Sequence, residues 1–498
     1  MLLLRNSRCR ATAFTVALLA VVLLPGLPPG PGSAAADAGT RDVRSSEVTF
    51  TGAGGVTLRG TVVAPPQANG RRPAIVMVHG AGPVTRDEFR DEAEAYARRG
   101  VVALIYDKRT EGYSPVRRDY GMLAADALAA VRTLRARPEV DPHRVGIWGL
   151  SEGAWVAPVA AVRSPQVAFL IVAGAVGTTP ARQQAWAYGE RLAHAGVRGS
   201  LVTALPWRFT RYAVAAGLFA EAGHDPVREW ERIRQPVLAV WGTLDREAVP
   251  AESAKIIAAA LARGGNEHHT IRFIDGVRHN LNGTRDDGFD RPDLLPASYA
   301  ELETAWIESQ ADGAPPSSVS IPAAQARARV SEPVDGPLAW YEAPWWQPVA
   351  LALFALACLG HPVAALVRRV RGRRGVPVAA RPARVFVAAL AATTLGFLGY
   401  VGVLALTGAT VIGPVVLGRP VPWLLLQLLA VTVVAAGITT AVTAWRTRRR
   451  PAHGARGASR AAVQDIAPAP EGRVRLWLLL VAGLAFVPWA LFWGLIIP

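Results

Sequence analysis

A serine lies between two glycines in the segment RVGIWGLSEGAW, which covers residues 144–155. The apolar run before Gly149 is typical of a buried strand, and the residues after Ser151 are typical of a helix. A serine on such a sharp strand-to-helix turn exposes its hydroxyl, as a nucleophile must. The pattern G-x-S-x-G alone is weak, because it also arises by chance and because serine commonly caps helices. The interpretation therefore depends on partner residues elsewhere in the chain.

A serine hydroxyl needs a base that takes its proton and an acid that orients the base. His279 lies in the loop that follows the predicted strand HTIRFI, and Asp245 follows the predicted strand PVLAVWG. The order Ser–Asp–His, with each residue just after a strand, is typical of hydrolases with a parallel sheet. We therefore predict Ser151 as nucleophile, His279 as general base and Asp245 as orienting acid. Glu247 and Asp275 remain alternatives for the acid.

Acyl transfer also requires N–H donors for the negatively charged oxygen of the tetrahedral intermediate. The backbone N–H of Glu152, the residue after the nucleophile, is the first expected donor. The second is expected from the loop after VMVHG, where Ala81 or Gly82 would supply it. His79 is expected to shape that turn without taking part in the chemistry.

Three charged residues, Asp107, Lys108 and Arg109, follow the next predicted strand and should lie at the same edge of the sheet. Such residues can bind a substrate, and they can equally form a structural network of ion pairs. The sequence leaves both interpretations open.

The elements that must position these residues alternate along the chain from about residue 45. Short apolar strands and amphipathic helices follow one another, which predicts an α/β fold with a doubly wound, mostly parallel sheet over residues 45–312. Residues 177–233 lack a strand pattern and carry many aromatic side chains, so we predict a helical cap there. The Pro-, Ala- and Ser-rich segment 313–346 is expected to be a linker.

Five segments resemble the α/β-hydrolase superfamily, in particular its dienelactone-hydrolase-like and prolyl-oligopeptidase-like serine hydrolases. They are VMVHGAGPVTRDEF, ALIYDKRTEGYS, RPEVDPHRVGIWGLSEGAW, VLAVWGTLD and DGVRHNL. The resemblance covers residues 45–310 and implies the α/β-hydrolase fold and a Ser–His–Asp acyl hydrolase with the donors named above. Many relatives carry a second glycine where Ala154 stands here. We identify no family for the rest of the chain.

The chain also has features of a membrane protein. Its hydrophobic fraction of 51% and mean hydropathy of +0.23 are high for a soluble protein. Residues 1–36 combine a basic start, an apolar run and small residues, which predicts a signal peptide or an N-terminal anchor. We predict an all-α transmembrane domain over residues 347–498. Its four spans are each about as long as the hydrocarbon core requires: 347–367, 385–406, 421–444 and 476–497.

Arginine distribution predicts the orientation of these spans. The loops 368–384 and 445–475 hold seven and eight arginines, whereas the loop 407–420 holds one. Positively charged loops stay in the cytoplasm, so the hydrolase domain is expected on the extracytoplasmic side of the cell membrane. Most of the net charge of +16 belongs to this tail, and the near-neutral central domain argues against a nucleic-acid partner.

Metal and cofactor sites are not expected. Cys9 and Cys358 are the only cysteines of the sequence, and the acidic loop 285–293 lacks the spacing of a calcium-binding loop. The expected partners are a small-molecule acyl substrate and the lipid bilayer. The sequence thus predicts a membrane-anchored serine hydrolase that cleaves carboxylic esters. A serine peptidase, a thioesterase and a non-catalytic membrane sensor that retains the fold remain alternatives.

Overall fold

The computed structural model describes residues 43–497 except for several short stretches. These are residues 67–69, 115, 293–296, 327, 335, 371, 373–378 and 450–469. The predicted signal peptide or anchor, residues 1–36, lies outside the described residues. Most of the arginine-rich loop 445–475 also lies outside them.

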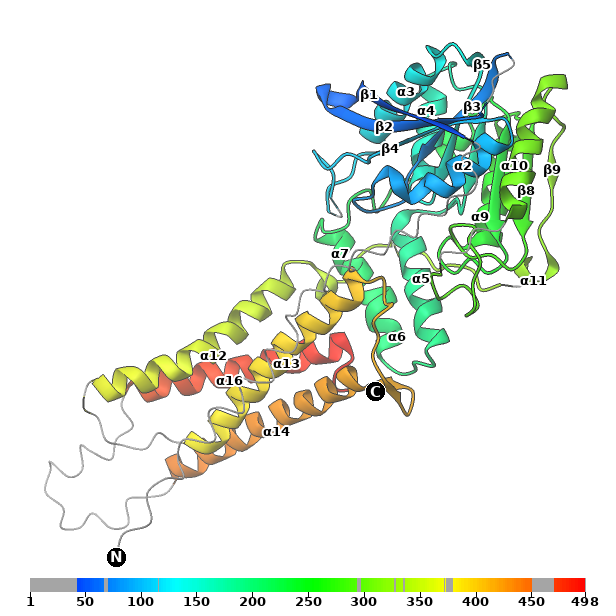
Figure 1. Cartoon of the computed structure of the whole chain (residues 1–498). Coiled ribbons are helices and arrows are strands. Elements are labelled where there is room, and N and C mark those ends of the chain that lie inside the picture. The colour runs from blue at the N-terminus through cyan, green and yellow to red at the C-terminus, as the bar shows by residue number, and fades with distance from the viewer. Residues whose placement is uncertain are drawn as a thin grey trace, which may run out of the picture. The chain divides into compact units, whose positions relative to one another are not determined.

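A nine-stranded sheet forms the centre of the α/β domain, in the order β1-β2-β4-β3-β5-β6-β7-β8-β9 (Figure 1). Its strands are β1 (Arg44–Thr51), β2 (Thr57–Ala64), β3 (Arg72–Val78), β4 (Val102–Tyr106), β5 (Val140–Leu150), β6 (Leu170–Ala173), β7 (Val237–Gly242), β8 (His269–Ile274) and β9 (Ser318–Val319). β2 pairs antiparallel with β1 and β4, and every later pairing is parallel. The predicted mostly parallel sheet is confirmed, and its carboxyl edge collects the loops that follow β3 to β8.

Helices cover both faces of this sheet because its strands are apolar on both sides. Along β3, Ala74 and Val76 face one core while Ile75 and Met77 face the other, and all four are fully buried. The first core includes α3 (Tyr120–Arg135), α4 (Gly153–Arg163) and α9 (Pro250–Arg263), and the second includes α2 (Arg90–Arg98) and α10 (Ala297–Ser309). The domain therefore has three layers, as expected for strands that read as continuous apolar runs.

The segment predicted as a cap is helical in the structure. It contains α5 (Pro180–His194), α6 (Leu201–Thr203), the π-helical turn η3 (Ala204–Phe209), α7 (Thr210–Ala215) and α8 (Val227–Trp230). The start of α5 follows local chemistry: the Thr179 hydroxyl accepts from the N–H of Arg182, and Pro180 occupies the first turn.

The segment expected to be a linker, 313–346, makes many contacts with the domain. It contributes β9, which pairs with β8, and a stretch from Arg329 to Glu342 that runs along the cap. Trp186 Nε1 donates to the Arg329 carbonyl at 3.0 Å, and Arg211 reaches the Glu342 carboxylate at 2.9 Å. We call the described residues of this stretch, 329–334 and 336–342, the strap, because they lie against the cap.

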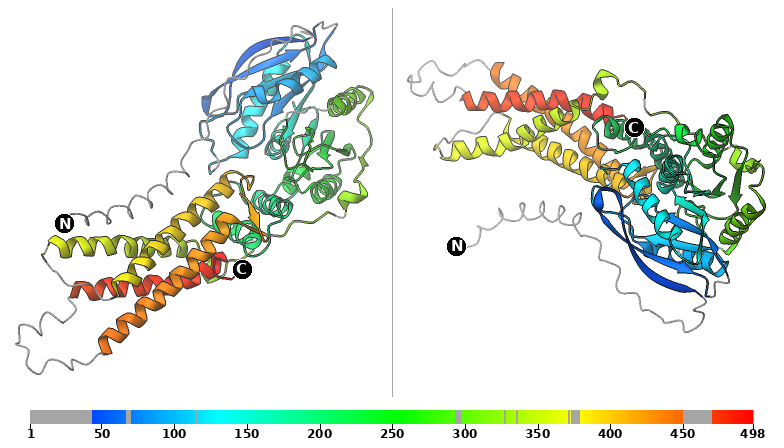
Figure 2. Two further views of the ribbon diagram at one scale, coloured as in Figure 1. Left: turned by 60° about the horizontal axis from the view of Figure 1, so that its bottom comes forward. Right: turned by 90° about the horizontal axis from the view of Figure 1, so that it is seen from above.

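Four long helices follow the strap: α12 (Trp346–Val370), α13 (Ala380–Leu406), α14 (Val421–Arg449) and α16 (Pro470–Trp493). They run side by side as a bundle (Figure 2). Among the described residues, three segments are long and apolar enough to cross a membrane: Ala380–Leu406, Val421–Thr447 and Val474–Trp493. In α12 the strongly apolar part, Trp346–Gly360, is shorter. Outward-facing leucines such as Leu395 and Leu484, which are 58% and 77% exposed, suit a lipid environment.

The cap packs against one end of this bundle. Tyr188, Leu192 and Leu201 of the cap share an apolar cluster with the bundle helices. At its centre the Ser200 hydroxyl donates to the Gly494 carbonyl at 2.6 Å. The same hydroxyl accepts from Trp423 Nε1 at 3.1 Å and from Gln427 Nε2 at 3.3 Å. These polar groups satisfy one another where the cap meets the bundle.

Candidate active site

Ser151 lies on a strained turn between β5 and α4. Its φ of 54° falls in the left-handed region, which a non-glycine residue occupies only where the surrounding structure requires it. The serine N–H donates to the Ala173 carbonyl at the end of β6 at 3.0 Å, and its carbonyl accepts from the Ala154 N–H at 2.9 Å. The turn therefore has the strand-to-helix geometry that the sequence predicts.

The flanking glycines are required by close backbone contacts. A Cβ atom on Gly149 would lie 2.4 Å from the Gly153 carbonyl oxygen, and one on Gly153 would lie 2.3 Å from that of Val78. Both distances are shorter than any real Cβ contact. The small residues thus let β5, α4 and the end of β3 converge at the serine.

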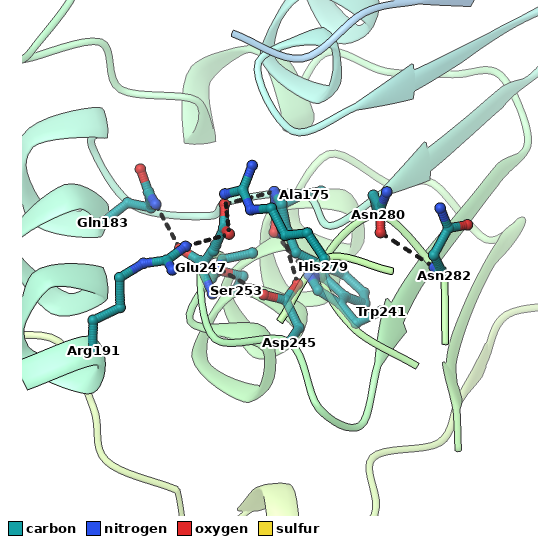
Figure 3. Close-up of polar contacts among 12 residues, drawn as sticks. Ala175, Gln183, Arg191, Trp241, Asp245, Glu247, Ser253, His279, Asn280 and Asn282 are labelled. Atoms are coloured by element: carbon teal, nitrogen blue, oxygen red, sulfur yellow. Dashed lines mark hydrogen bonds and ion pairs between the residues drawn. The ribbon is translucent and has the colours of Figure 1, made fainter. Parts of the chain in front are cut away.

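Asp245 and His279 meet at the same edge of the sheet, after β7 and β8 (Figure 3). The Nδ1–H of His279 donates to Asp245 Oδ2 at 2.9 Å. The other carboxylate oxygen accepts the backbone N–H groups of Glu247 and Ala248 at 2.8 and 2.9 Å. Asp245 is 1% exposed, and these two N–H groups hold its carboxylate in place. This arrangement fixes the histidine tautomer that leaves Nε2 free to take a proton.

The other acids considered from the sequence have different surroundings. Asp275 accepts a hydrogen bond from the Thr243 hydroxyl at 2.9 Å and does not reach the histidine ring. Glu247 lies 4.0 Å from Nε2 of His279, on the side of the ring opposite the Asp245 contact. Its geometry fits an electrostatic neighbour of the histidine and not the acid that orients it.

Two arginines hold Glu247 in this position. Arg191 of α5 lies 2.7 Å from its carboxylate, and Arg291 lies 3.0 Å from it. The side chain of Gln183, also on α5, donates to the Glu247 carbonyl at 2.5 Å (Figure 3). The cap is thereby connected directly to the loop that carries the acid and its neighbour.

The charges around His279 and its burial have opposite effects on its pKa. Burial by itself lowers the pKa of the imidazole, because it penalises the charged form. The Asp245 carboxylate, through its charge and hydrogen bond, and the nearby Glu247 charge outweigh this effect. The pKa of His279 is consequently raised above its usual 6.5.

Ser151 and His279 approach the same strand end without a hydrogen bond between them. The serine N–H bonds to Ala173, and a Cβ on the next residue, Gly174, would lie 2.7 Å from Cε1 of the His279 ring. Nε2 of His279 is buried and has no hydrogen-bond partner among the described residues. Hydrogen bonds between a nucleophile and its general base commonly tighten only when substrate binds.

The predicted oxyanion donors differ in their availability. The Gly82 N–H donates to the Tyr113 hydroxyl at 2.9 Å. The N–H groups of Ala81 and Glu152 make no hydrogen bond with any described residue. Glu152 precedes α4, where the first N–H groups of the helix are without intrahelical partners.

Nearby charged residues form pairs within the protein. Lys108 lies 2.5 Å from the Glu152 carboxylate and Arg109 lies 3.5 Å from that of Asp126, and all four side chains are at most 5% exposed. Asp107 accepts from the backbone N–H of Arg86 at 3.0 Å. Of the two interpretations left open by the sequence, this geometry fits the structural network.

His79 stacks on Phe89 with ring centroids 4.4 Å apart, and its Nε2 contacts the Tyr106 carbonyl at 2.9 Å. Burial lowers the pKa of this histidine to about 4, so it is neutral near pH 7. Both observations agree with a residue that shapes the loop.

Sequence reasoning missed several residues of the site: Tyr113, Arg118, Gln183, Arg191 and Arg291. Tyr113 and Arg118 lie in or near the motif YDKRTEGYS, Gln183 and Arg191 lie in the cap, and Arg291 lies in the acidic loop 285–293. None of these positions indicates which strand end the side chain reaches. A cavity of about 270 Å³ between α5, α9 and residues 325–330 contains none of the predicted catalytic residues.

Among the described residues, no group of three or more His, Cys, Asp or Glu side chains could hold a metal ion.

Comparison with known proteins agrees with the fold. Residues 88–311 match the prolyl oligopeptidase family. Esterase EstD of Thermotoga maritima is 28% identical over 239 residues, which are 43% of this chain and 56% of that protein. Thiohydrolase aneE of Aspergillus aculeatus is 34% identical over 130 residues, which are 25% of this chain and 40% of that protein. The chain thus spans about half the length of the curated relatives it matches.

Among solved structures, a puromycin-hydrolyzing peptidase of Mycobacterium tuberculosis aligns with 55% of this chain and 40% of its own, at 20% identity and a TM-score of 0.40. A dienelactone hydrolase from Klebsiella pneumoniae aligns with 53% of this chain and 98% of its own, at 16% identity and a TM-score of 0.38. The family match and the esterase relative thus show that this part of the α/β domain is similar to serine hydrolases.

Proposed function

We propose that this chain, whose α/β domain is that of a serine hydrolase related to the prolyl oligopeptidase family, cleaves acyl bonds with Ser151, His279 and Asp245. The observation that carries the proposal is the 2.9 Å hydrogen bond between His279 Nδ1 and the buried Asp245, beside the strained elbow of Ser151. A histidine oriented in this way can accept a proton only on the nitrogen that faces the site.

The proposed reaction has two stages. Ser151 Oγ forms a bond to the acyl carbon while its proton passes to Nε2 of His279. The tetrahedral intermediate collapses when His279 returns that proton to the leaving oxygen, and the alcohol departs. Water then attacks the acyl-enzyme with His279 again as base, and the carboxylic acid leaves Ser151. Asp245 stabilises the imidazolium in both stages and keeps its own charge.

The oxyanion of each intermediate requires two N–H donors. The N–H groups of Ala81 and Glu152 are free of intrachain partners among the described residues, which supports them for this role. Donors fixed by the backbone need no rearrangement as the charge develops, and each such donor typically contributes about 10²-fold to 10³-fold in rate.

Carboxylic esters are the proposed substrates. The similarity to an esterase over 43% of the chain supports this choice over amides. Thioesters and peptides remain alternatives within the same chemistry, because a thiohydrolase is similar over 25% of the chain and the matching family model is that of prolyl oligopeptidases.

A fluorophosphonate probe tests the proposal on the full-length, detergent-solubilised protein. The wild type should be labelled, whereas Ser151→Ala should not be labelled and His279→Gln should react at least about 10³-fold more slowly. An ester panel then measures kcat/KM for the wild type. A folded wild type that neither labels nor hydrolyses esters, thioesters or amides would instead favour a non-catalytic membrane sensor.

We also propose that the bundle anchors the protein in a membrane, with the hydrolase domain on the extracytoplasmic side. Three helices long and apolar enough to span a bilayer support the anchoring. The arginine-rich loops 368–384 and 445–475 support the orientation through the positive-inside rule.

Reporter fusions test this orientation. Alkaline phosphatase, which is active only outside the cytoplasm, should be active when fused after residue 320 and inactive when fused at residue 458. A fluorescent protein that folds only in the cytoplasm should give the reverse pattern. The opposite pair of signals would reverse the proposed topology.

A further inference from the structure

We call residues 80–82, which follow β3, the oxyanion loop. We infer that Lys108, Tyr113 and Glu152 form a positioning network that holds this loop against the nucleophile elbow and leaves Ala81 as its N–H donor. The inference rests on the proposed hydrolase function. It concerns residues that touch neither the substrate nor the reacting atoms, and that act through the two backbone N–H donors.

The first observation is a buried ion pair between the two segments that supply the donors. Lys108 Nζ lies 2.5 Å from Glu152 Oε1, and the two residues are 8% and 1% exposed. Arg118 lies 3.1 Å from the other carboxylate oxygen. A buried ion pair is a poor source of net stability, because desolvation offsets the attraction. Its place beside the nucleophile therefore suggests a role in positioning.

Lys108 also contacts the oxyanion loop directly. Its ammonium group donates to the Gly80 carbonyl at 2.6 Å and to the Tyr113 hydroxyl at 3.0 Å. One side chain thus joins the loop after β3, the loop after β4 and the first residue after the nucleophile. The Lys108 ammonium has three protons, and these contacts account for all of them.

The hydrogen bonds of the Tyr113 hydroxyl are likewise fully assigned. A phenol has one proton and accepts on its lone pairs. Its oxygen accepts from the Gly82 N–H at 2.9 Å and from Lys108, so its own proton is directed to Glu152 Oε1, which lies 2.9 Å away. The hydroxyl therefore has no donor left for a substrate oxygen.

This assignment distinguishes the two candidate donors of the loop. The N–H of Gly82 is already engaged by the Tyr113 hydroxyl. The N–H of Ala81 has no partner among the described residues. With Glu152 supplying the other N–H, the Lys108–Glu152 pair sets the distance between the two donors.

The network predicts a defect in kcat and not in substrate binding. Tyr113→Phe removes the acceptor of the Gly82 N–H and one contact of Lys108, while the ring and the charges stay. We expect kcat for a short ester to fall about 10-fold to 100-fold, with KM changed less than about threefold, because a misaligned donor weakens transition-state binding alone. Labelling by the fluorophosphonate should slow by a similar factor.

Tyr299→Phe is the matched control. Tyr299 is a buried tyrosine of the other core, and its hydroxyl has no partner among the described residues. It should keep wild-type kcat, KM and labelling rate. If the probe labels the wild type and Tyr113→Phe still has wild-type kcat, the proposed network is overturned. A wild type that does not label would contradict the hydrolase proposal itself.

A second variant applies if Tyr113→Phe does not fold. Lys108→Met combined with Glu152→Gln removes both charges of the pair together, so that neither is left unpaired by the loss of the other. Arg118 loses its carboxylate partner, but its side chain is 15% exposed. The same loss of kcat at nearly constant KM is expected, and its melting temperature in detergent reports folding independently. An unchanged kcat in a folded double variant would also overturn the inference.

Discussion

At the scale of single residues, the site depends on the charges around one imidazole. Asp245 orients His279 through Nδ1, while Glu247 lies 4.0 Å from the opposite nitrogen. Both carboxylates favour the protonated ring and outweigh the burial that opposes it. Glu247 is held by arginines from the cap and from a neighbouring loop, so the charge beside the histidine depends on distant elements.

This arrangement predicts a specific pH profile. His279 acts as a base only when neutral, so kcat/KM should fall as the pH drops through its pKa, with a midpoint above 6.5. Glu247→Gln removes one charge that raises this pKa, and the acid limb should therefore shift to lower pH. Glu267→Gln, in an exposed loop, is the matched control and should leave the midpoint in place. A midpoint unchanged by Glu247→Gln would contradict the electrostatic role of that residue.

At the scale of elements, the elbow exists because three backbone segments approach one another more closely than side chains allow. β5 ends at Leu150, α4 begins at Gly153, and the end of β3 lies directly against the start of that helix. Burial of both sheet faces holds these segments together. The left-handed φ of Ser151 is the local cost of this convergence.

Gly153→Ala tests this close approach. The new Cβ would lie 2.3 Å from the Val78 carbonyl oxygen, so β3 or α4 must move. We expect a loss of about 1–3 kcal/mol of unfolding free energy, together with slower labelling of Ser151, because the oxyanion loop follows β3 directly. Gly223→Ala is the control, since a Cβ there meets no atom within 4 Å. Wild-type stability and labelling in Gly153→Ala would show that the turn tolerates a side chain.

At the scale of the whole molecule, the cap connects the α/β domain with the helical bundle. Its helix α5 reaches Glu247 through Arg191 and reaches the bundle through Tyr188, whose hydroxyl lies 3.4 Å from the Ala405 carbonyl. The strap adds a second connection along the cap through Arg211. The bundle helices therefore contribute to the surroundings of the candidate site through a continuous set of contacts.

The Ser200 cluster tests this connection. Ser200→Ala removes one donor and leaves the Gly494 carbonyl and the side chains of Trp423 and Gln427 without that hydroxyl. We expect a loss of about 1–3 kcal/mol, seen as a lower melting temperature of the full-length protein in detergent. Ser320→Ala, at an exposed position, should have no such effect. Equal melting temperatures for both variants would mean that the cluster adds no stability.

The sequence by itself determined the parts of this protein that rest on local pattern. The apolar strands, the glycines around Ser151 and the spacing of Asp245 and His279 after successive strands predicted the sheet and the residues of the candidate site. Hydrophobic length predicted the bundle helices in the same way, because span length follows from the thickness of the hydrocarbon core.

Only the tertiary structure decided the contacts between segments far apart in the chain. The charge of Glu247 beside His279, the Tyr113 hydrogen bond that occupies Gly82, and the packing of the strap on the cap each join residues without a shared periodicity. Composition made the strap look like a free linker, because proline, alanine and serine carry little signal for where a segment packs. Such contacts arise only when burial brings separate strand ends and helices together, and local sequence does not encode which ends will meet.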